Sequence, residues 1–574
     1  MINDSVAMMQ RRVRVALGHE PADLLLTGGN IVNVFTLAVE QADIAIVDSR
    51  IAGVGRYPWA AKQTIDITGR YVMPGFIDAH MHLESTLLTP AELARVIVPH
   101  GTTATLSDSH EIGNVLGIPG IDMLIEASEN LPFDLFFAAS SCVPAVSWEL
   151  AGATLGPVEV GTLLGRERVL SLAEVMDVPA VLAGDAKMLA KIERSLHAGK
   201  AVDGHAPGML GRDLQAYACT GIRSDHESST VEEAIAKAGA GILVQVREGS
   251  SALNLDAILP ALAAGKLGDN WCLVTDDIFP NDLLKNGHID GLLRRCVAGG
   301  VKPADAIRHA TLVPARHYGL ADRGAVAPGF LADLVVTDDL TNFRVREVFK
   351  AGVLAARDGA MAIDLPPRTL KYGNTINPGP IDESIFRLRL SAGTQLVIGI
   401  VPDQIITTAQ STTVKAGDWV FDPAIDIVLV ACIERHHATG KHGVGLVSGF
   451  GFTKHGAFGS SVGHDSHNLV VAGTNAADMA ACVTALQDSG GGFVVCAGGE
   501  VRALLPLPIG GLLSPMSGVD VARKLAEVNA AAHVLGCKLA MPFGTLSFLA
   551  LPVIPDVRIT PLGLFDVRTQ QFVK

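Results

Sequence analysis

The chain has 574 residues, of which 49% are apolar and 18% are charged, and its formal net charge is −14. This composition is typical of a folded protein with more than one domain and excludes a disordered chain. The sequence has no basic run that could follow a phosphate backbone, so we expect a small-molecule substrate and no nucleic-acid partner.

The segment 1–20 mixes acidic residues with arginines and lacks the apolar core of a signal peptide. The sequence has no run of about 18 or more uncharged apolar residues, so we expect no membrane partner and a cytoplasmic location. The eight cysteines form no CxxC pair, which indicates buried free thiols in a reducing compartment.

Residues 22–55 contain short β-rich runs that are separated by Gly-Gly, Asn and Asp-Ser. This pattern predicts strands and hairpins, and it returns at 324–363. We therefore expect a small β-sandwich domain that is built from both flanks, residues 1–71 and 323–384, with the middle of the chain inserted between them.

The middle region, 72–322, alternates short apolar runs with helical patterns. Repeated β-then-α units over this length predict an α/β fold, a (β/α)8 TIM-like barrel. One helix start is sharply marked, with Thr89 as N-cap, Pro90 at N1 and Glu92 completing a capping box. Gly101 is expected to end that helix.

Residues 385–574 are too long for a tail and contain strand-like runs such as "IDIVLVACIE". An amphipathic helix is expected at 476–489, with Met479, Val483 and Leu486 on one face. We predict an additional C-terminal α/β domain there.

The stretch "PGFIDAHMHLEST", residues 74–86, places two histidines at alternate positions after an apolar run. Side chains at i and i+2 share one face of a strand, so His80 and His82 point the same way. At the C-terminal end of a barrel strand they would reach the mouth of the barrel, where two imidazoles could bind a divalent metal.

Four further polar residues follow apolar runs in the middle region: Glu174, His205, His226 and Asp276. Each alone could cap a helix or form an ordinary hydrogen bond. Together with the two histidines they predict a binuclear centre for Zn, Mn or Fe(II). A carboxylate or a carbamylated lysine could bridge the metals. No lysine ends a strand between His82 and His205, so Glu174 is the preferred bridge.

Other polar clusters leave alternatives open. Asp108, His110 and Glu111 would lie on a loop above the barrel mouth, where helix capping is an equal explanation. His464, Asp465 and His467 precede an apolar strand and could be a polar loop. Glu84 could hydrogen-bond a ligand histidine in the second shell of the metals, cap backbone amides, or contact a third ion.

With these residues in place, the chain resembles the bacterial adenine deaminases of the amidohydrolase superfamily over nearly its whole length. The motifs that carry the resemblance are "MPGFIDAHMHLESTLLTP", "HEIGNV", "AEVM", "GHAPGMLGRDLQAY", "SDHE", "TDDIFPNDLLKNGHID", "ATLVPARHYGL" and "GSSVGHDSHNLVV". The His-x-His pair alone marks only the superfamily, whereas "HLEST", "SDHE" and "HDSHN" are narrower.

The resemblance implies a barrel, a small β domain and a C-terminal domain that completes the site. It also implies a centre of two Mn²⁺ or Fe²⁺ ions (Zn²⁺ being an option) that hydrolyses adenine to hypoxanthine and ammonia. By the same resemblance, His80 and His82 would bind the first metal, Glu174 would bridge, and His205 and His226 would bind the second. Asp276 would be the aspartate of the last strand.

The sequence departs from the family pattern at Ser109, Ile278 and Phe279. Because the last two follow Asp276 closely, they are expected to alter the rim of the substrate pocket.

In the hypothetical mechanism, a metal-activated water attacks C6, and Asp276 accepts its proton and passes it to the departing amine. Glu227 and Glu111 are the candidate donors to ring N1. His110 would order the substrate or the metal ligands, and His464, Asp465 and His467 would bind the substrate.

Other reactions are weighed against this one: a related amidohydrolase acting on another 6-substituted purine or on a cyclic amide, or a non-catalytic scaffold. The unrelated zinc deaminases are excluded because they require a CxxC motif. A homodimer or homotetramer is expected.

Overall fold

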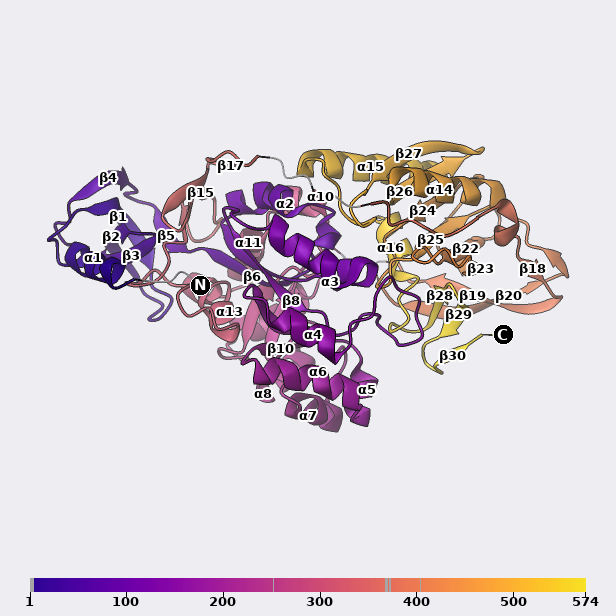
Figure 1. Cartoon of the computed structure of the whole chain (residues 1–574), viewed down its shortest axis with the longest axis horizontal. Helices are drawn as coiled ribbons and strands as arrows, with labels where there is room; N and C mark the ends of the chain where they lie inside the picture. The colour runs from indigo at the N-terminus through magenta and orange to yellow at the C-terminus, as the bar shows by residue number, and fades with distance from the viewer. Residues whose placement is uncertain (1–4, 251, 367–369, 371–372, 403, 574) are drawn as a thin grey trace.

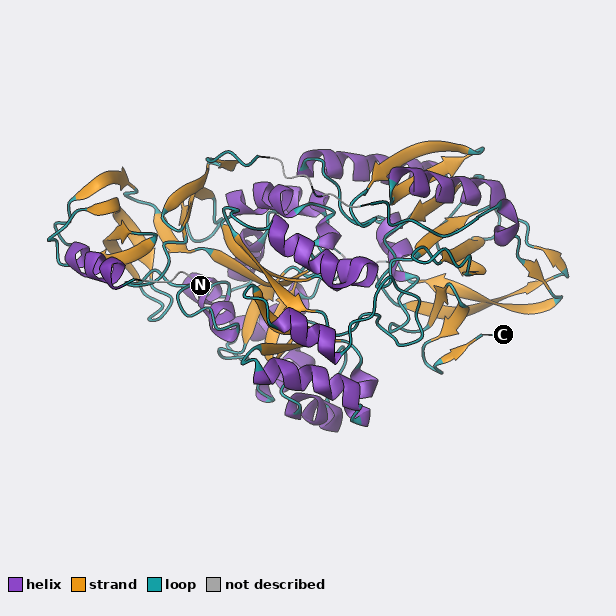
Figure 2. Cartoon of the chain, in the orientation of Figure 1, coloured by secondary structure: helices purple, strands orange, loops and turns teal. Residues whose placement is uncertain are grey.

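The computed structural model describes residues 5–250, 252–366, 370, 373–402 and 404–573. Three parts follow one another along the long axis of the molecule (Figure 1): a β-rich part near the N-terminus, a central barrel and a C-terminal part. Helices surround the strands of the barrel, whereas the first part consists mainly of strands and loops with the helix α1 on one side, residues Val6–Ala16 (Figure 2).

The first part contains a sheet that both flanks of the chain build. Among the described residues its order is β17-β16-β15-β14-β5-β1-β2-β3, with β4 paired to β1. The bounds are β1 Ala22–Val32, β2 Val39–Val47, β3 Arg50–Gly55, β4 Ala61–Asp66, β5 Tyr71–Pro74, β14 Leu334–Thr337, β15 Val345–Lys350, β16 Val353–Arg357 and β17 Ala360–Met361, with helix α1 Val6–Ala16 packed on β2 and β3. The flanks meet where β14 pairs antiparallel with β5. β5 thus belongs to this sheet, although most of it falls within the range expected for the barrel. The predicted domain boundaries themselves stay a prediction.

The central part is the expected TIM-like barrel. In the described chain its strands run in parallel order from β6 to β13. They are β6 Phe76–Met81, β7 Thr102–Asp108, β8 Asp134–Ala139, β9 Val169–Val175, β10 Ala201–Gly204, β11 Ser224–Asp225, β12 Leu243–Arg247 and β13 Trp271–Val274. An isolated parallel bridge between Met81 and Asp276 closes the ring. The carboxyl ends of these strands therefore meet at one mouth, as the (β/α)8 prediction requires.

The helices of the barrel lie between and after these strands. Their bounds are α2 Pro90–Ile97, α3 His110–Ala127, α4 Pro157–Leu164, α5 Val178–Ala183, α6 Ala186–His197, α7 Gly211–Cys219, α8 Val231–Gly239, α9 Leu255–Ala263, α10 Pro280–Asn286, α11 Ile289–Ala298, α12 Pro303–His309 and α13 Leu312–His317, with the 3₁₀ turns η1 Glu84–Thr86 and η2 Val98–His100. α2 begins as predicted, since Thr89 Oγ1 accepts from the amide of Glu92 at 3.4 Å. The other half of the predicted capping box, a hydrogen bond from the Thr89 amide to the Glu92 carboxylate, is wrong. The Glu92 carboxylate instead accepts from Nε of Arg95 at 3.1 Å. η2 follows α2, and Gly101 then ends the segment at φ +90.

The C-terminal part is mixed α/β. Over the described residues its main sheet has the order β20-β19-β23-β22-β25-β24-β26-β27, beside the small sheets β18-β21 and β28-β29-β30. The bounds are β18 Arg389–Leu390, β19 Gly393–Ile400, β20 Thr407–Val414, β21 Gly417–Asp418, β22 Ile427–Ile433, β23 His442–Ser448, β24 Ala457–Ser460, β25 Leu469–Gly473, β26 Gly492–Ala497, β27 Glu500–Pro506, β28 Val557–Thr560, β29 Gly563–Asp566 and β30 Gln571–Phe572, with η3 Glu383–Phe386, α14 Ala476–Ser489, α15 Gly518–Val534 and α16 Pro542–Phe548. α14 is the predicted amphipathic helix, and its residues Met479, Val483 and Leu486 are buried.

Two further features bear on the expectations from sequence. Seven of the cysteines are buried free thiols and Cys219 is exposed. In the part of the chain that the structure describes, none of the helices combines the length and apolar character needed to cross a membrane.

Candidate metal centre and substrate cavity

The predicted metal ligands all come from the carboxyl ends of barrel strands. His80 lies near the end of β6 with His82 just after it, and Glu174 lies near the end of β9. His205, His226 and Asp276 follow β10, β11 and β13 by one or two residues. All are buried except His205, which is half-buried. The barrel therefore collects side chains from distant parts of the sequence at one mouth.

Glu174 lies between two groups of histidines, the first being His80 with His82 and the second His205 with His226. One of its oxygens, Oε1, is 3.5 Å from Nε2 of His82. The other, Oε2, is 2.7 Å from Nδ1 of His205 and 3.2 Å from Nε2 of His226. Each carboxylate oxygen thus faces a different histidine group, as a ligand bridging two cations would.

Asp276 completes the first group. Its Oδ1 is 3.3 Å from Nε2 of His80 and 3.0 Å from Nε2 of His82. Asp276 has a left-handed φ of 58°, which aspartate tolerates better than most residues. The rings of His80 and His226 stack with centroids 4.1 Å apart, which brings the two groups together.

The donor set fits two divalent cations. Neutral imidazoles and carboxylates suit Zn, Mn and Fe(II). Nδ1 of His82 donates to the carbonyl oxygen of Asp108 at 3.0 Å, so Nε2 keeps its lone pair for a metal. Nε2 of His80 is buried without a hydrogen-bond partner among the described residues. A cation bound to this atom would satisfy it.

Arg247, the last residue of β12, was not among the residues predicted from sequence. Its Nη1 donates to Oδ2 of Asp276 at 2.8 Å, and its Nη2 donates to Oε2 of Glu227 at 3.0 Å. Burial alone would raise the pKa values of Glu227 and Asp276, but Arg247 and the neighbouring histidines outweigh it and hold both well below their usual range. The sequence pattern that could have indicated Arg247 is its position at the end of the apolar run "ILVQVR".

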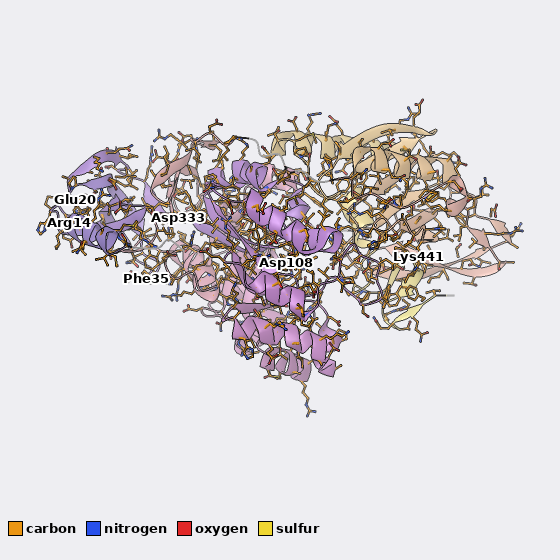
Figure 3. All side chains as sticks on the ribbon, in the orientation of Figure 1. Arg14, Glu20, Phe35, Asp108, Asp333 and Lys441 are labelled. Atoms are coloured by element: carbon orange, nitrogen blue, oxygen red, sulfur yellow. The ribbon has the colours of Figure 1, made fainter. Side chains whose placement is uncertain are left out.

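His110 connects the centre to the C-terminal part. Its Nδ1 is 3.6 Å from Oε1 of Glu174, and its Nε2 is 3.6 Å from Oδ1 of Asp465. Asp108, which holds His82, lies near the middle of the molecule in Figure 3. Asp108 ends β7, and His110 and Glu111 belong to the first turn of α3, so the expectation that these three residues lie on a loop is wrong. The start of α3 and the loop before β25 meet at the barrel mouth.

Glu84 does not hydrogen-bond a ligand histidine. Its Oε1 accepts from the amide of Ile112 in the first turn of α3 at 3.0 Å, which matches the amide-capping alternative. Burial raises the pKa of Glu84 to about 7, and it raises that of Glu111 well above normal, helped by the charge of Glu84. Contact with a third ion stays a prediction.

His464 and His467 lie on the far side of Glu111. Nδ1 of His464 is 3.9 Å from Oε1 of Glu111, and Nε2 of His467 is 3.7 Å from Oε2. Nδ1 of His467 accepts from the amide of Gly463 at 3.3 Å, so the neutral ring carries its proton on Nε2, toward Glu111. This proton leaves Nε2 without a lone pair for a metal.

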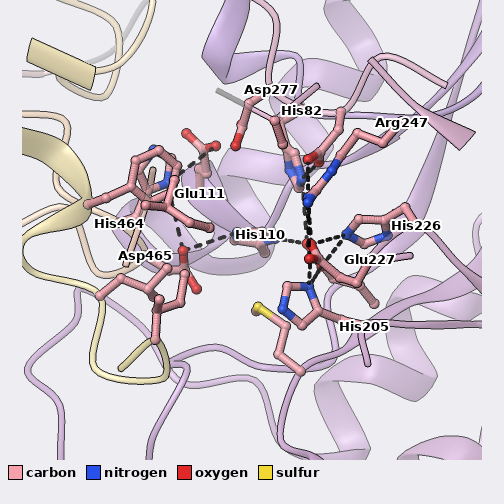
Figure 4. A pocket seen from close by; sticks show the side chains of 18 residues that line it. His82, His110, Glu111, His205, His226, Glu227, Arg247, Asp277, His464 and Asp465 are labelled. Atoms are coloured by element: carbon pink, nitrogen blue, oxygen red, sulfur yellow. Dashed lines mark hydrogen bonds and ion pairs between the residues drawn. The ribbon is translucent and has the colours of Figure 1, made fainter. Parts of the chain in front are cut away.

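A cavity opens between the centre and the C-terminal part (Figure 4). Its polar lining is His82, His110, Glu111, Glu174, His205, His226, Glu227, Arg247, Asp276, Asp277, His464 and Asp465. Its apolar lining is Met176, Ala252, Ile405, Phe548, Leu551 and Ile554. Polar and apolar lining groups together suit a flat polar ring.

Not every expected residue lines this cavity. His467, Ile278 and Phe279 do not, whereas Asp277 does. Ile278 is buried in the hydrophobic core, and Phe279 packs against that core. Any influence of Ile278 and Phe279 on the substrate would therefore be indirect.

Comparison with known proteins gives matches over both large parts of the chain. Residues 71–355 match a family model described as "Amidohydrolase family", and residues 404–571 match "Adenine deaminase C-terminal domain". The adenine deaminase of Nitratidesulfovibrio vulgaris (strain DP4) is 44% identical over 576 residues, covering 100% of this chain and 98% of that protein. That of Desulfatibacillum aliphaticivorans is 42% identical over 578 residues, covering 100% and 99%. Among solved structures, a beta-aspartyl dipeptidase from Fervidobacterium islandicum AW-1 has 17% identity and a TM-score of 0.45, covering 62% of this chain and 100% of that one.

Proposed function

The chain belongs to the adenine deaminase family of amidohydrolases, and on that premise we propose how its residues hydrolyse adenine to hypoxanthine and ammonia. The enzyme is a metal-dependent hydrolase of carbon–nitrogen bonds other than peptide bonds. The observation that carries the proposed mechanism is the position of Glu174, whose two oxygens face separate histidine groups.

We propose that His80, His82 and Asp276 hold one divalent cation, and that His205 and His226 hold a second, with Glu174 between them. The preferred ions are Mn²⁺ or Fe²⁺, with Zn²⁺ as an alternative. Bound there, they would supply a nucleophilic water at neutral pH and stabilise developing negative charge.

Asp276 is the proposed general base. Its Oδ1 faces the ligand histidines, while its Oδ2 is held by Arg247. A carboxylate that is fixed and ionised in this way can accept the proton of the attacking water and deliver it to the amine that leaves C6. Arg247 would favour the ionised form of Asp276 before it accepts the proton and again after it has delivered the proton.

The ring nitrogen N1 requires a proton or a strong hydrogen bond as C6 becomes tetrahedral. Glu227 is ionised against Arg247, with both of its oxygens accepting hydrogen bonds, which favours an accepting and orienting role. The pKa of Glu111 is raised by burial and by Glu84, and its Oε2 has no hydrogen-bond partner in the described structure. Of these two carboxyls, Glu111 is the better donor to N1.

The opposite wall of the cavity would bind the purine face. Phe548 stacks on His464 with centroids 4.3 Å apart, and Leu551 and Ile554 lie beside them in the lining. Asp465 and His464 offer polar atoms at the edge of this wall, so we keep them as proposed substrate contacts. His467 would act through His464 and Glu111 rather than by touching the substrate.

We further propose a cytoplasmic homodimer or homotetramer, from the general preference of soluble enzymes for symmetric assembly. Activity toward another 6-substituted purine is kept as the alternative proposal.

One experiment tests the proposal. The purified protein is analysed for bound metal, and adenine turnover is followed by ultraviolet absorbance with and without Mn(II) under reducing conditions. Two ions per chain and Mn-dependent formation of hypoxanthine are expected. A protein that binds no metal, or that deaminates adenine equally well after complete metal removal, would contradict it.

A further inference from the structure

The first and last strands of the barrel meet along a seam that carries half of the proposed ligands. The amide of Asp276 donates to the carbonyl oxygen of His80 at 3.0 Å, and the amide of His82 donates to that of Asp276 at 3.3 Å. The positions of these three side chains therefore depend on how β6 and β13 are held together.

Asp78 is a fully buried carboxylate at this seam. Its Oδ1 accepts from the amides of His80 and Thr275, both at 3.3 Å. Its Oδ2 accepts from Oγ1 of Thr275 at 2.5 Å. The side chain of Asp78 thus hydrogen-bonds the backbone of the ligand His80 on its own strand. Across the seam it also hydrogen-bonds Thr275, the residue that precedes Asp276.

His288 faces this carboxylate from outside the strands, in close contact rather than in a well-formed hydrogen bond. It lies at the N-terminal end of α11, is fully buried, and places Nε2 at 3.0 Å from Oδ2 of Asp78. Its Nδ1 lies 2.7 Å from Oγ1 of Thr102 at the start of β7. Its amide donates to Oδ1 of Asp290 at 2.8 Å, which fixes the loop that carries it. Without His288, the buried carboxylate of Asp78 would lose its only histidine contact in the described structure.

We propose that Asp78 and His288 are positioning residues that set the affinity of the metal centre by holding His80 and Asp276 in place across the β6–β13 seam. This inference rests on the metal centre proposed above. Neither residue lines the cavity, so both act through the ligands rather than on the substrate. Groups that orient metal ligands typically contribute roughly 10–100-fold to metal affinity.

The test compares Mn(II) dissociation constants of the full-length apoprotein, measured by equilibrium dialysis and metal analysis. The variants are His288→Gln and Asp78→Asn, and His309→Gln is the matched control. His309 is another buried histidine packed on β13, where it stacks on Trp271 with centroids 3.9 Å apart, and in the described structure it makes no hydrogen bond or ion pair with Asp78. His288→Gln and Asp78→Asn should bind Mn(II) about 10–100-fold more weakly. His309→Gln should lower the thermal midpoint while keeping wild-type affinity.

A second measurement separates positioning from folding. At saturating Mn(II) the positioning variants should regain adenine turnover with a wild-type KM, because the substrate wall is untouched. If both variants fail to fold, Thr275→Val removes one hydrogen bond to Asp78 at nearly constant volume and should weaken Mn(II) binding to a smaller degree. Wild-type Mn(II) affinity in the folded variants, or an equal loss in His309→Gln, would overturn the inference. Failure of the wild type itself to bind Mn(II) would instead overturn the metal centre.

Discussion

Arg247 donates a hydrogen bond to Oδ2 of Asp276 at 2.8 Å, deep in the barrel mouth. The same guanidinium group binds both oxygens of Glu227, so one cation links the proposed base to a second carboxylate of the site. Neutralising this cation would remove the positive charge that links these two buried carboxylates.

Arg247→Gln should therefore retain metal but lower kcat by roughly 10–100-fold, because Asp276 would be less well fixed and less readily ionised. Steady-state kinetics with metal analysis of the same sample check this. Arg223→Gln is a suitable control, since in the described structure that arginine donates to backbone carbonyls outside the cavity. A normal kcat in Arg247→Gln would remove Arg247 from the mechanism.

Asp276→Asn tests the base directly. The amide keeps an oxygen for the metal but cannot accept a proton at neutral pH, so turnover should fall by about 10²–10⁴-fold while bound metal remains. Adenine turnover and metal stoichiometry are measured together. Near-normal deamination by the metal-loaded variant would exclude the proton-transfer role.

The positions of the metal ligands could be predicted from sequence because each follows an apolar strand, and the strand order of a barrel brings such ends together. Arg247 was missed because a lone arginine after a strand gives no signal of what it binds. The apolar wall could not be predicted either. Phe548, Leu551 and Ile554 look like ordinary core residues in the sequence, and only tertiary structure brings them to the barrel mouth.

Glu92 shows a second limit of sequence patterns. The spacing of Thr89 and Glu92 is right for a capping box, and the Thr89 half of it forms. Arg95, one turn further along the helix, donates a hydrogen bond to the Glu92 carboxylate, which therefore does not accept from the Thr89 amide. The spacing of a capping-box motif shows which hydrogen bonds are geometrically possible. A neighbouring charged side chain then determines which of them forms.

Glu111→Gln tests the proposed donor to N1. A donor must be protonated, so wild-type kcat should fall as the pH rises through the raised pKa of Glu111. The variant should have a kcat lower by roughly 10²–10⁴-fold and should lack this alkaline limb. Glu149→Gln is the matched control, a buried carboxyl with a raised pKa outside the cavity, and it should keep the limb. An unchanged alkaline limb in Glu111→Gln would assign that limb to another group.

Asp134, the first residue of β8, links the barrel to the first sheet. It accepts from Nζ of Lys350 at 2.6 Å and also binds Arg323. Burial would raise its pKa, but these two cations outweigh burial and hold the pKa of Asp134 well below its usual value. A depressed folded pKa stabilises the fold fully above the unfolded pKa of about 3.9, and this stabilisation is lost as the pH falls toward the folded pKa.

Asp134→Asn should therefore lower the free energy of unfolding by about 2 kcal/mol at pH 7, and by progressively less below about pH 4. Urea unfolding of the metal-loaded enzyme at several pH values measures this difference. Asp358→Asn is the matched control, because Asp358 forms an exposed pair with Arg346 at 2.8 Å and should change stability little at any pH. An equal loss at pH 7 and pH 3 for Asp134→Asn would show that the variant acts through packing rather than through the charge of Asp134.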